Sequence, residues 1–171
     1  MEIFKYVLPA FIVMMTAYLL LDRMLSNEEK KRKHELTKKN HDTTLPIRLR
    51  AYERIMLLLE RTKPGTMVLE TIKPGMKCID FQSVMIQSIR KEFEHNYAQQ
   101  IYVSNELWKA VCVTRENLIK LVNTTAAHFN PEENASKMAE GIIRIYAESE
   151  QTPSDIAIDI LKSEIRNQFF L

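Results

Sequence analysis

The 171-residue chain carries a net charge of only +2 and is 46% hydrophobic, so it can form one domain with its own core but not comfortably two. Its only cysteines are Cys78 and Cys112, which excludes a disulfide framework and fits a reducing compartment. With Gly65, Gly75 and Gly141 as the only glycines, neither a P-loop nor a dinucleotide-binding fingerprint can be built, and no G-x-S-x-G elbow is present.

The first predicted element is an apolar helix from Ile3 to Leu21, interrupted by one charged residue, Lys5. At about 1.5 Å per residue, a run of this length spans roughly 28 Å, close to the ~30 Å hydrocarbon core of a bilayer. A cleavable signal peptide is disfavoured because residues 15–22 contain no pair of small residues at the spacing of a cleavage site. We therefore expect residues 1–21 to be a retained transmembrane anchor.

A basic segment, residues 22–45, follows the apolar run and is predicted to be a charged helical stalk. The cationic side chains expected to meet lipid headgroups are Lys30, Lys31, Arg32, Lys33, Lys38 and Lys39. Glu28 and Arg32 stand at the i,i+4 spacing that stabilises a helix. Because Lys and Arg mark the cytoplasmic side of a span, we expect the N-terminus outside and all later residues in the cytoplasm.

Residues 46–171 are predicted to form an all-α domain, a bundle of about five helices with short connections. His41–Thr44 should end the stalk, and Pro46 should begin the first bundle helix. The apolar residues expected to face the core from this helix are Leu49, Tyr52, Ile55, Met56 and Leu59. A further helical stripe near the C-terminus includes Ile156. Residues of the type that caps a helix N-terminus predict the later starts at Asp80, Ser104, Asn130–Pro131 and Thr152–Pro153.

Two segments of identical sequence, Lys63–Pro64–Gly65 and Lys73–Pro74–Gly75, are each expected to form a turn with glycine at positive φ. Between them, Thr66–Ile72 fits either a short strand or a turn of helix, and the pattern leaves both open. As a strand it could pair with Gln100–Val103, the other stretch with strand character.

One short motif has metal-ligand spacing. Glu92–Phe93–Glu94–His95 contains Glu-x-x-His, which ferritin-like bundles use twice, but this chain contains it once. We therefore predict no metal site, no cofactor and no catalytic residue. A metal-binding or enzymatic bundle centred on Glu92, Glu94 and His95 is kept as an alternative.

Polar side chains gather just after this motif, between Tyr97 and Tyr102 and on their N-terminal side. The residues proposed for a partner or ligand surface are Glu94, His95, Asn96, Gln99 and Gln100. The competing interpretation is a helix end whose side chains bond to unpaired carbonyl groups around a buried turn.

The segments Leu45–Arg54 and Leu58–Arg61 resemble a family of small uncharacterised membrane proteins from Bacteroidota bacteria. The likeness continues through Phe93–Asn96, Gln99–Ser104 and Ile156–Asp159 and covers nearly the whole chain. It implies a bacterial inner-membrane setting and carries over no catalytic residue or cofactor.

Together these patterns predict a non-enzymatic interaction or scaffold module, single-pass in the inner membrane and part of an envelope-associated assembly. The expected partners are the lipid bilayer and a protein at its cytoplasmic face, since tethering raises the effective concentration near membrane partners. Homo-oligomer formation is left open. Nucleic acid is not expected, because the domain lacks a basic patch with interleaved aromatic residues. A second alternative is an adaptor that senses anionic lipid through the basic segment, where each basic residue gains about 1 kcal/mol.

Overall fold

The computed structural model describes the backbone of residues 3–169, and side chains from residue 14 onward except those of residues 17, 19, 34, 36–42, 168 and 169. The chain divides into two compact units, Met1–Pro46 and Ile47–Leu171. In the first unit, Glu28 and Arg32 form the predicted i,i+4 ion pair, at 3.9 Å.

Helix α1 (Ile3–Arg61) runs without interruption through the predicted anchor, stalk and first bundle helix. The predicted break at His41–Thr44 and the predicted new start at Pro46 are therefore wrong. Proline removes one helical hydrogen bond and crowds the carbonyl group four residues earlier, which costs about 3 kcal/mol. The backbone hydrogen bonds of the residues on either side are still made, so the helix continues through Pro46.

Among the described residues, no helix meets the length and hydrophobicity that a membrane crossing requires. The predicted anchor lies largely outside that set, because the side chains of residues 1–13, 17 and 19 are not described.

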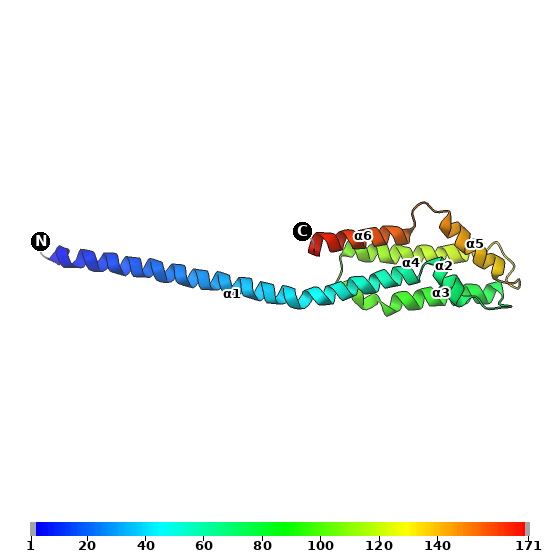
Figure 1. Ribbon diagram of the computed structural model, residues 1–171, viewed down its shortest axis with the longest axis horizontal. Helices are drawn as coiled ribbons and strands as arrows, with labels where there is room; N and C mark the ends of the chain where they lie inside the picture. Colours follow the sequence, from blue (N-terminus) through cyan, green and yellow to red (C-terminus); the bar gives the residue numbers. More distant parts are fainter. Residues whose placement is uncertain (1–2, 170–171) are drawn as a thin grey trace. The chain divides into compact units, whose positions relative to one another are not determined.

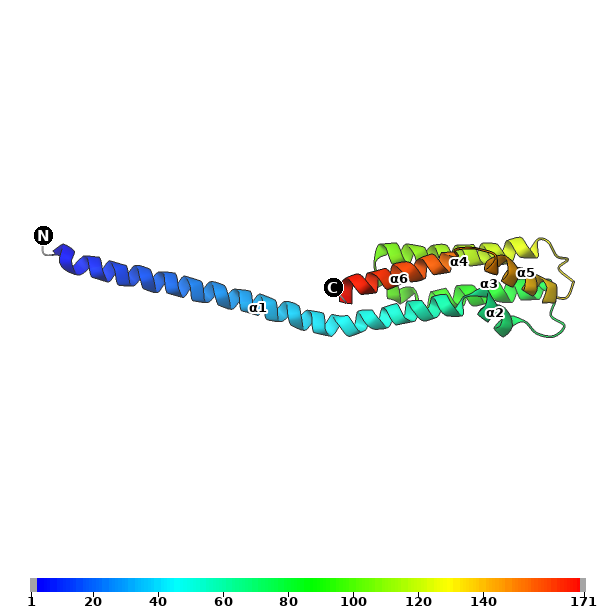
Figure 2. The same ribbon diagram turned by 45° about the horizontal axis from the view of Figure 1, so that its top comes forward.

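The second unit is a bundle in which helices pack around a shared core (Figures 1 and 2). Its elements after α1 are α2 (Pro64–Thr71), α3 (Cys78–His95), the 3₁₀-helix η1 (Tyr97–Ile101), α4 (Asn105–Ala126), α5 (Ser136–Ala147) and α6 (Pro153–Phe169). Helix α4 packs against α3, α5 and α6, while α2 packs against α3 and α5. The predicted all-α bundle is confirmed for the described part of this unit.

Of the two structures left open for Thr66–Ile72, the helix is the one observed, and the first half of Gln100–Val103 is helical as well. Thr66–Thr71 lies within α2, and Gln100 and Ile101 end η1. The proposed strand pairing is therefore wrong. Within residues 3–169, β-structure is limited to one isolated bridge between Lys77 and Asn134.

The core consists of large side chains with less than 2% of their surface exposed. These are Tyr52, Ile55, Leu58, Leu59, Phe81, Met85, Ile89, Phe93, Leu107, Met138, Ile142 and Leu161. On α1, the predicted burial of Tyr52, Ile55 and Leu59 is confirmed, whereas Leu49 was also expected to face the core and is 43% exposed. On α6, Ile156 was expected in the core but is 42% exposed, and Ala157 and Ile158 are buried instead.

Two of the predicted helix caps are confirmed. The Leu107 backbone N–H donates to Ser104 Oγ at 3.1 Å, so Ser104 caps α4. Thr152 caps α6 through Asp155: the Asp155 N–H donates to Thr152 Oγ1 at 3.2 Å, and the Thr152 N–H donates to Asp155 Oδ2 at 3.1 Å. Reciprocal bonds of this kind form a capping box.

The predicted helix starts at Asp80 and at Asn130–Pro131 are wrong. Backbone carbonyl groups of the loop before α5, rather than a capping side chain, accept the first N–H bonds of α3. Helix α3 begins at Cys78 rather than near Asp80. The N–H groups of Cys78 and Ile79 donate to the carbonyl groups of Glu133 (2.9 Å) and Pro131 (3.1 Å). These bonds supply the acceptors that a helix start needs. They also hold residues 130–135 against α3, so α5 begins only at Ser136.

Candidate functional site

The predicted partner surface at the end of α3 is only partly on the surface. Glu94, His95 and Gln100 are exposed, whereas Asn96 and Gln99 are 7% and 8% exposed. Asn96 Nδ2 donates to the carbonyl oxygen of Glu92, four residues earlier, at 2.9 Å. Asn96 therefore bonds to a carbonyl group at the helix end, as the competing interpretation of this segment expects, and Gln99 is buried in the turn.

The described residues bring no three His, Cys, Asp or Glu side chains together at a spacing that could hold a metal ion. Glu92 lines a surface hollow that it shares with the cationic residues Arg61, Lys73 and Lys91. Glu94 lines a different hollow, beside Arg90. The two carboxylates of the Glu-x-x-His segment are thus placed apart, each near positive charge.

Of the residues expected to meet lipid headgroups, Lys30, Lys31, Arg32 and Lys33 are exposed on α1. The side chains of Lys38 and Lys39 lie outside the described residues. Exposure makes contact with headgroups feasible, and that contact stays a prediction.

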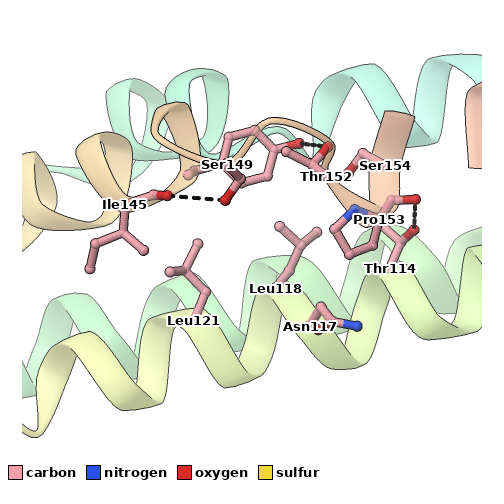
Figure 3. Close-up of a pocket in the computed structure, with 10 residues that line it drawn as sticks. Thr114, Asn117, Leu118, Leu121, Ile145, Ser149, Thr152, Pro153 and Ser154 are labelled. Carbon is pink, nitrogen blue, oxygen red and sulfur yellow. Dashed lines mark hydrogen bonds between the residues drawn. The ribbon is translucent and has the colours of Figure 1, made fainter. Parts of the chain in front are cut away.

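A pocket of about 150 Å³ lies between α4 and the turn that joins α5 to α6 (Figure 3). Its apolar wall is formed by Leu118, Leu121, Ile145 and Pro153. None of the described residues lining it is charged. The sequence analysis missed this pocket because its residues come from three helices, α4, α5 and α6, and the turn between the last two, and belong to no short motif.

Hydroxyl groups and the amide group of Asn117 line the rest of the pocket, and the hydrogen-bond donors among the hydroxyl groups can be assigned. The Thr152 hydroxyl donates to Asp155 Oδ2 at 2.7 Å, which uses its single proton. The Tyr146 hydroxyl lies 3.1 Å from Thr152 Oγ1 and must therefore be the donor in that bond. The hydrogen bonds from Thr152 hold the pKa of Asp155 below its usual value. Tyr146 and Thr152 are thus fixed by one chain of bonds that ends on a carboxylate.

The two remaining buried hydroxyl groups, those of Thr114 and Ser154, differ in whether they have a hydrogen-bond partner. Thr114 Oγ1 donates to the carbonyl oxygens of Ala110 and Pro153, each at 3.0 Å, and so ties α4 to the start of α6. Ser154 is only 1% exposed, and its Oγ has no hydrogen-bond partner within the described chain. Ser154 therefore borders the pocket, but its hydroxyl group is buried behind the lining and has no partner among the described residues.

A cluster around Glu164 joins α1, the turn before α4, and α6. Glu164 Oε1 accepts from the Tyr52 hydroxyl at 2.6 Å and from the Ser104 N–H at 3.0 Å, and Oε2 accepts from Ser104 Oγ at 2.8 Å. Arg48 donates to the Tyr102 carbonyl at 3.1 Å and to the Tyr52 hydroxyl at 3.2 Å. Burial, together with Glu164, raises the pKa of Tyr52 to about 12. Tyr52 therefore keeps its proton at neutral pH, and the cluster fastens three parts of the bundle.

An open apolar groove of about 590 Å³ lies between α2 and α5. Leu69 on α2 is 77% exposed, more than any other large apolar side chain in the described bundle, and Ile143 on α5 is 36% exposed. Tyr146 also lines the groove, and Lys63 and Glu70 are its charged residues. We call this the α2–α5 groove.

The described part of the bundle thus carries a small pocket with an uncharged lining and an open apolar groove, and Tyr146 lines both. The chain belongs to a family of unknown function, DUF7935, whose model matches residues 1–168. Comparisons with curated proteins and with solved structures found no match. The match covers nearly the whole chain and confirms the expectation that it belongs to an uncharacterised family.

Proposed function

We propose that this protein is a non-enzymatic interaction module, anchored by its first helix in the inner membrane of a Bacteroidota bacterium. Its helical bundle would bind a partner protein at the cytoplasmic face, as part of an envelope-associated assembly. The observation that carries the proposal is the α2–α5 groove.

The groove has the composition of a protein-binding surface. Its lining combines apolar side chains, among them Leu69 and Ile143, with the charged residues Lys63 and Glu70, and protein interfaces combine apolar and polar groups in the same way. Fully burying one leucine side chain is worth about 1.5–3 kcal/mol, so covering Leu69 would contribute usefully to binding. A groove between two helices suits the apolar face of a partner helix, and we propose a helix of a membrane-associated protein as its occupant.

The anchor and the basic segment support the membrane part of the proposal. The run from Ile3 to Leu21 has the length and apolar composition of a span. Lys30 to Lys33 follow it closely enough to reach anionic headgroups, and their position after the span favours a cytoplasmic bundle. Confinement to the membrane would allow a weak contact at the groove to suffice.

The contact is tested by placing a photo-reactive phenylalanine at position 69 of the full chain in living cells. We expect one discrete adduct, identified by mass spectrometry as a membrane-associated protein. The matched control is the same label at position 101, because Ile101 is 72% exposed but lies on η1, away from the groove. In the second control, Ile143→Asp should abolish the adduct at position 69. The proposal is wrong if position 69 gives no discrete adduct, or the same adducts as position 101.

Membrane placement is tested separately with a fluorescent protein fused after Leu171. Fluorescence in a carbonate-resistant membrane fraction is expected, and deletion of residues 2–21 should release it. A fusion that stays dark, or that remains membrane-bound after the deletion, would contradict the proposed anchor and orientation.

A further inference from the structure

We propose, in a step that rests on the function above, that the helix bound in the α2–α5 groove carries a lysine or arginine side chain that pairs with Glu70. Glu70 would then decide which apolar helices the groove accepts. The class of partner narrows accordingly, from any amphipathic helix to one with a basic residue beside its apolar stripe.

The groove lies between one face of α2 and one face of α5. The lining residues within these two helices include Thr66, Leu69 and Glu70 on α2 and Ile143, Tyr146 and Ala147 on α5. Within each helix these residues stand three or four positions apart, so they share one face. A helix bound in the groove would therefore contact both faces, and on the α2 side it would cover Leu69 and lie beside Glu70.

Two charged residues line the groove, and only one of them has a counter-charge within the described structure. Lys63 Nζ lies 2.8 Å from Glu60 Oε1, and this hydrogen bond raises the pKa of Lys63. Glu70 is exposed and forms no ion pair with any described residue. The positive charge at the groove is therefore already matched, whereas the negative charge relies on solvent.

Covering the groove would remove solvent from this carboxylate. Leu69 is 77% exposed and directly precedes Glu70, so a helix that buries Leu69 also displaces water around Glu70. A carboxylate that loses water without gaining a partner costs free energy, and a cation placed beside it offsets that cost. A helix with a neutral or acidic residue at this place would bind more weakly, which is how an unpaired charge excludes wrong partners.

The surroundings of Glu70 restrict where the basic residue can lie. On its other side Glu70 lines a second hollow, together with the cationic residues Arg61, Lys73 and Lys91. These three would repel further positive charge, so the expected partner has its basic residue on the groove side of Glu70 only. Segments of this kind are common in membrane proteins, because the cytoplasmic ends of their spans are rich in lysine and arginine.

The test measures the yield of the photo-cross-linked adduct at position 69 of the full chain in living cells, with Glu70 altered. Glu70→Gln should lower the yield about two- to fivefold, the loss expected for one partly exposed ion pair. Glu70→Lys should lower it about tenfold or more, because repulsion replaces attraction. The matched control is Glu53→Lys, the same change of charge at an exposed residue of α1 that does not line the groove, and it should leave the yield unchanged.

The cross-linked segment of the partner, located by mass spectrometry, provides the second half of the test. We expect a lysine or arginine within one helical turn of the cross-linked position, and its replacement by glutamate should restore the adduct in Glu70→Lys. An adduct that is as abundant in Glu70→Lys as in Glu53→Lys, or a segment without such a basic residue, would overturn the pairing alone. The absence of any discrete adduct at position 69 would overturn the proposed function and the pairing with it.

Discussion

Replacing Tyr52 by phenylalanine removes one oxygen atom from the cluster that joins α1, α6 and the turn before α4. The ring stays, so core packing is preserved, but Glu164 loses the donor that lies 2.6 Å from Oε1. Arg48 also loses one of its acceptors. The experiment therefore isolates the hydrogen bonds of a single buried hydroxyl group.

The expected loss of stability can be worked out in two ways. A hydrogen bond to a charged group contributes about 1.5–3 kcal/mol, so Tyr52→Phe should lower the free energy of unfolding by that amount at neutral pH. The raised pKa of Tyr52, from 10.0 to about 12, gives a pH signature. The folded state holds the phenolic proton more tightly than the unfolded chain does. This contribution is therefore complete below about pH 10 and is lost as the pH rises through about 12.

The assay compares urea unfolding of the wild type and Tyr52→Phe, followed by circular dichroism, at two pH values. Between about pH 8 and pH 11, the stability difference should shrink by roughly 1.4 kcal/mol, because one of the two pKa units has then been titrated. Other groups titrate in both proteins, so their effects cancel. Tyr18→Phe, which alters a tyrosine that is 69% exposed in the first unit, is the control and should change nothing.

Two results would show that this reasoning fails. Equal stability of the wild type and Tyr52→Phe at neutral pH would mean that the bond to Glu164 contributes nothing. A stability difference that stays constant up to about pH 11 would mean that the pKa of Tyr52 is not raised in the folded state.

Three further predictions concern turns, caps and the pocket. Gly75→Ala should destabilise the fold by about 1–2 kcal/mol in urea unfolding, because φ at this glycine is 76°. Gly65→Ala should stabilise it by up to about 1 kcal/mol, since Gly65 lies inside α2 with open space around it. If Gly75→Ala and Gly65→Ala changed stability equally, the positive φ at Gly75 and the helical conformation at Gly65 would be contradicted. Thr152→Ala should cost about 1–2 kcal/mol and raise the pKa of Asp155 toward its usual value, measured by carbon-13 NMR. The stabilising contribution of Asp155 is present above about pH 4 and is lost in acid, so Thr152→Ala should lose less stability than the wild type as the pH falls. An unchanged pKa of Asp155 in this variant would rule out the capping box. Ser154→Ala should leave the protein as stable as the wild type or up to about 3 kcal/mol more stable, because it removes a buried hydroxyl group with no partner in the described structure. A clear drop in the melting temperature would show that this hydroxyl group has a partner.

The helix N-termini show which features can be predicted from neighbouring residues and which cannot. Ser104 and Thr152 were predicted as caps, and both make the expected bonds, because a cap needs only residues within one turn. Asp80 and Asn130 have equally suitable side chains but do not begin helices. There, carbonyl groups from residues 131 and 133 supply the acceptors for α3, and that contact spans about 50 positions of the chain.

The two Lys–Pro–Gly segments show that even an identical tripeptide can adopt two different conformations. Gly75 adopts the positive φ that was expected, whereas Gly65 is helical and Pro64 occupies the first position of α2. Proline is suited both to a turn and to the first turn of a helix. The residues that come next along the chain make the difference. Met67, Val68 and Thr71 are buried at helical spacing after the first segment, so α2 can pack against α3 and α5.

The sequence by itself determined that the domain is helical and which face of α1 is buried, because those features depend on residues three and four positions apart. The pocket and the cluster around Glu164 were decided only by the tertiary structure. Tyr52 and Glu164 are 112 positions apart, and the pocket forms only where α4 lies against the turn that joins α5 to α6. Such contacts depend on how the helices pack against one another. Hydrophobic periodicity shows which face of a helix is buried but not which other helix packs against that face.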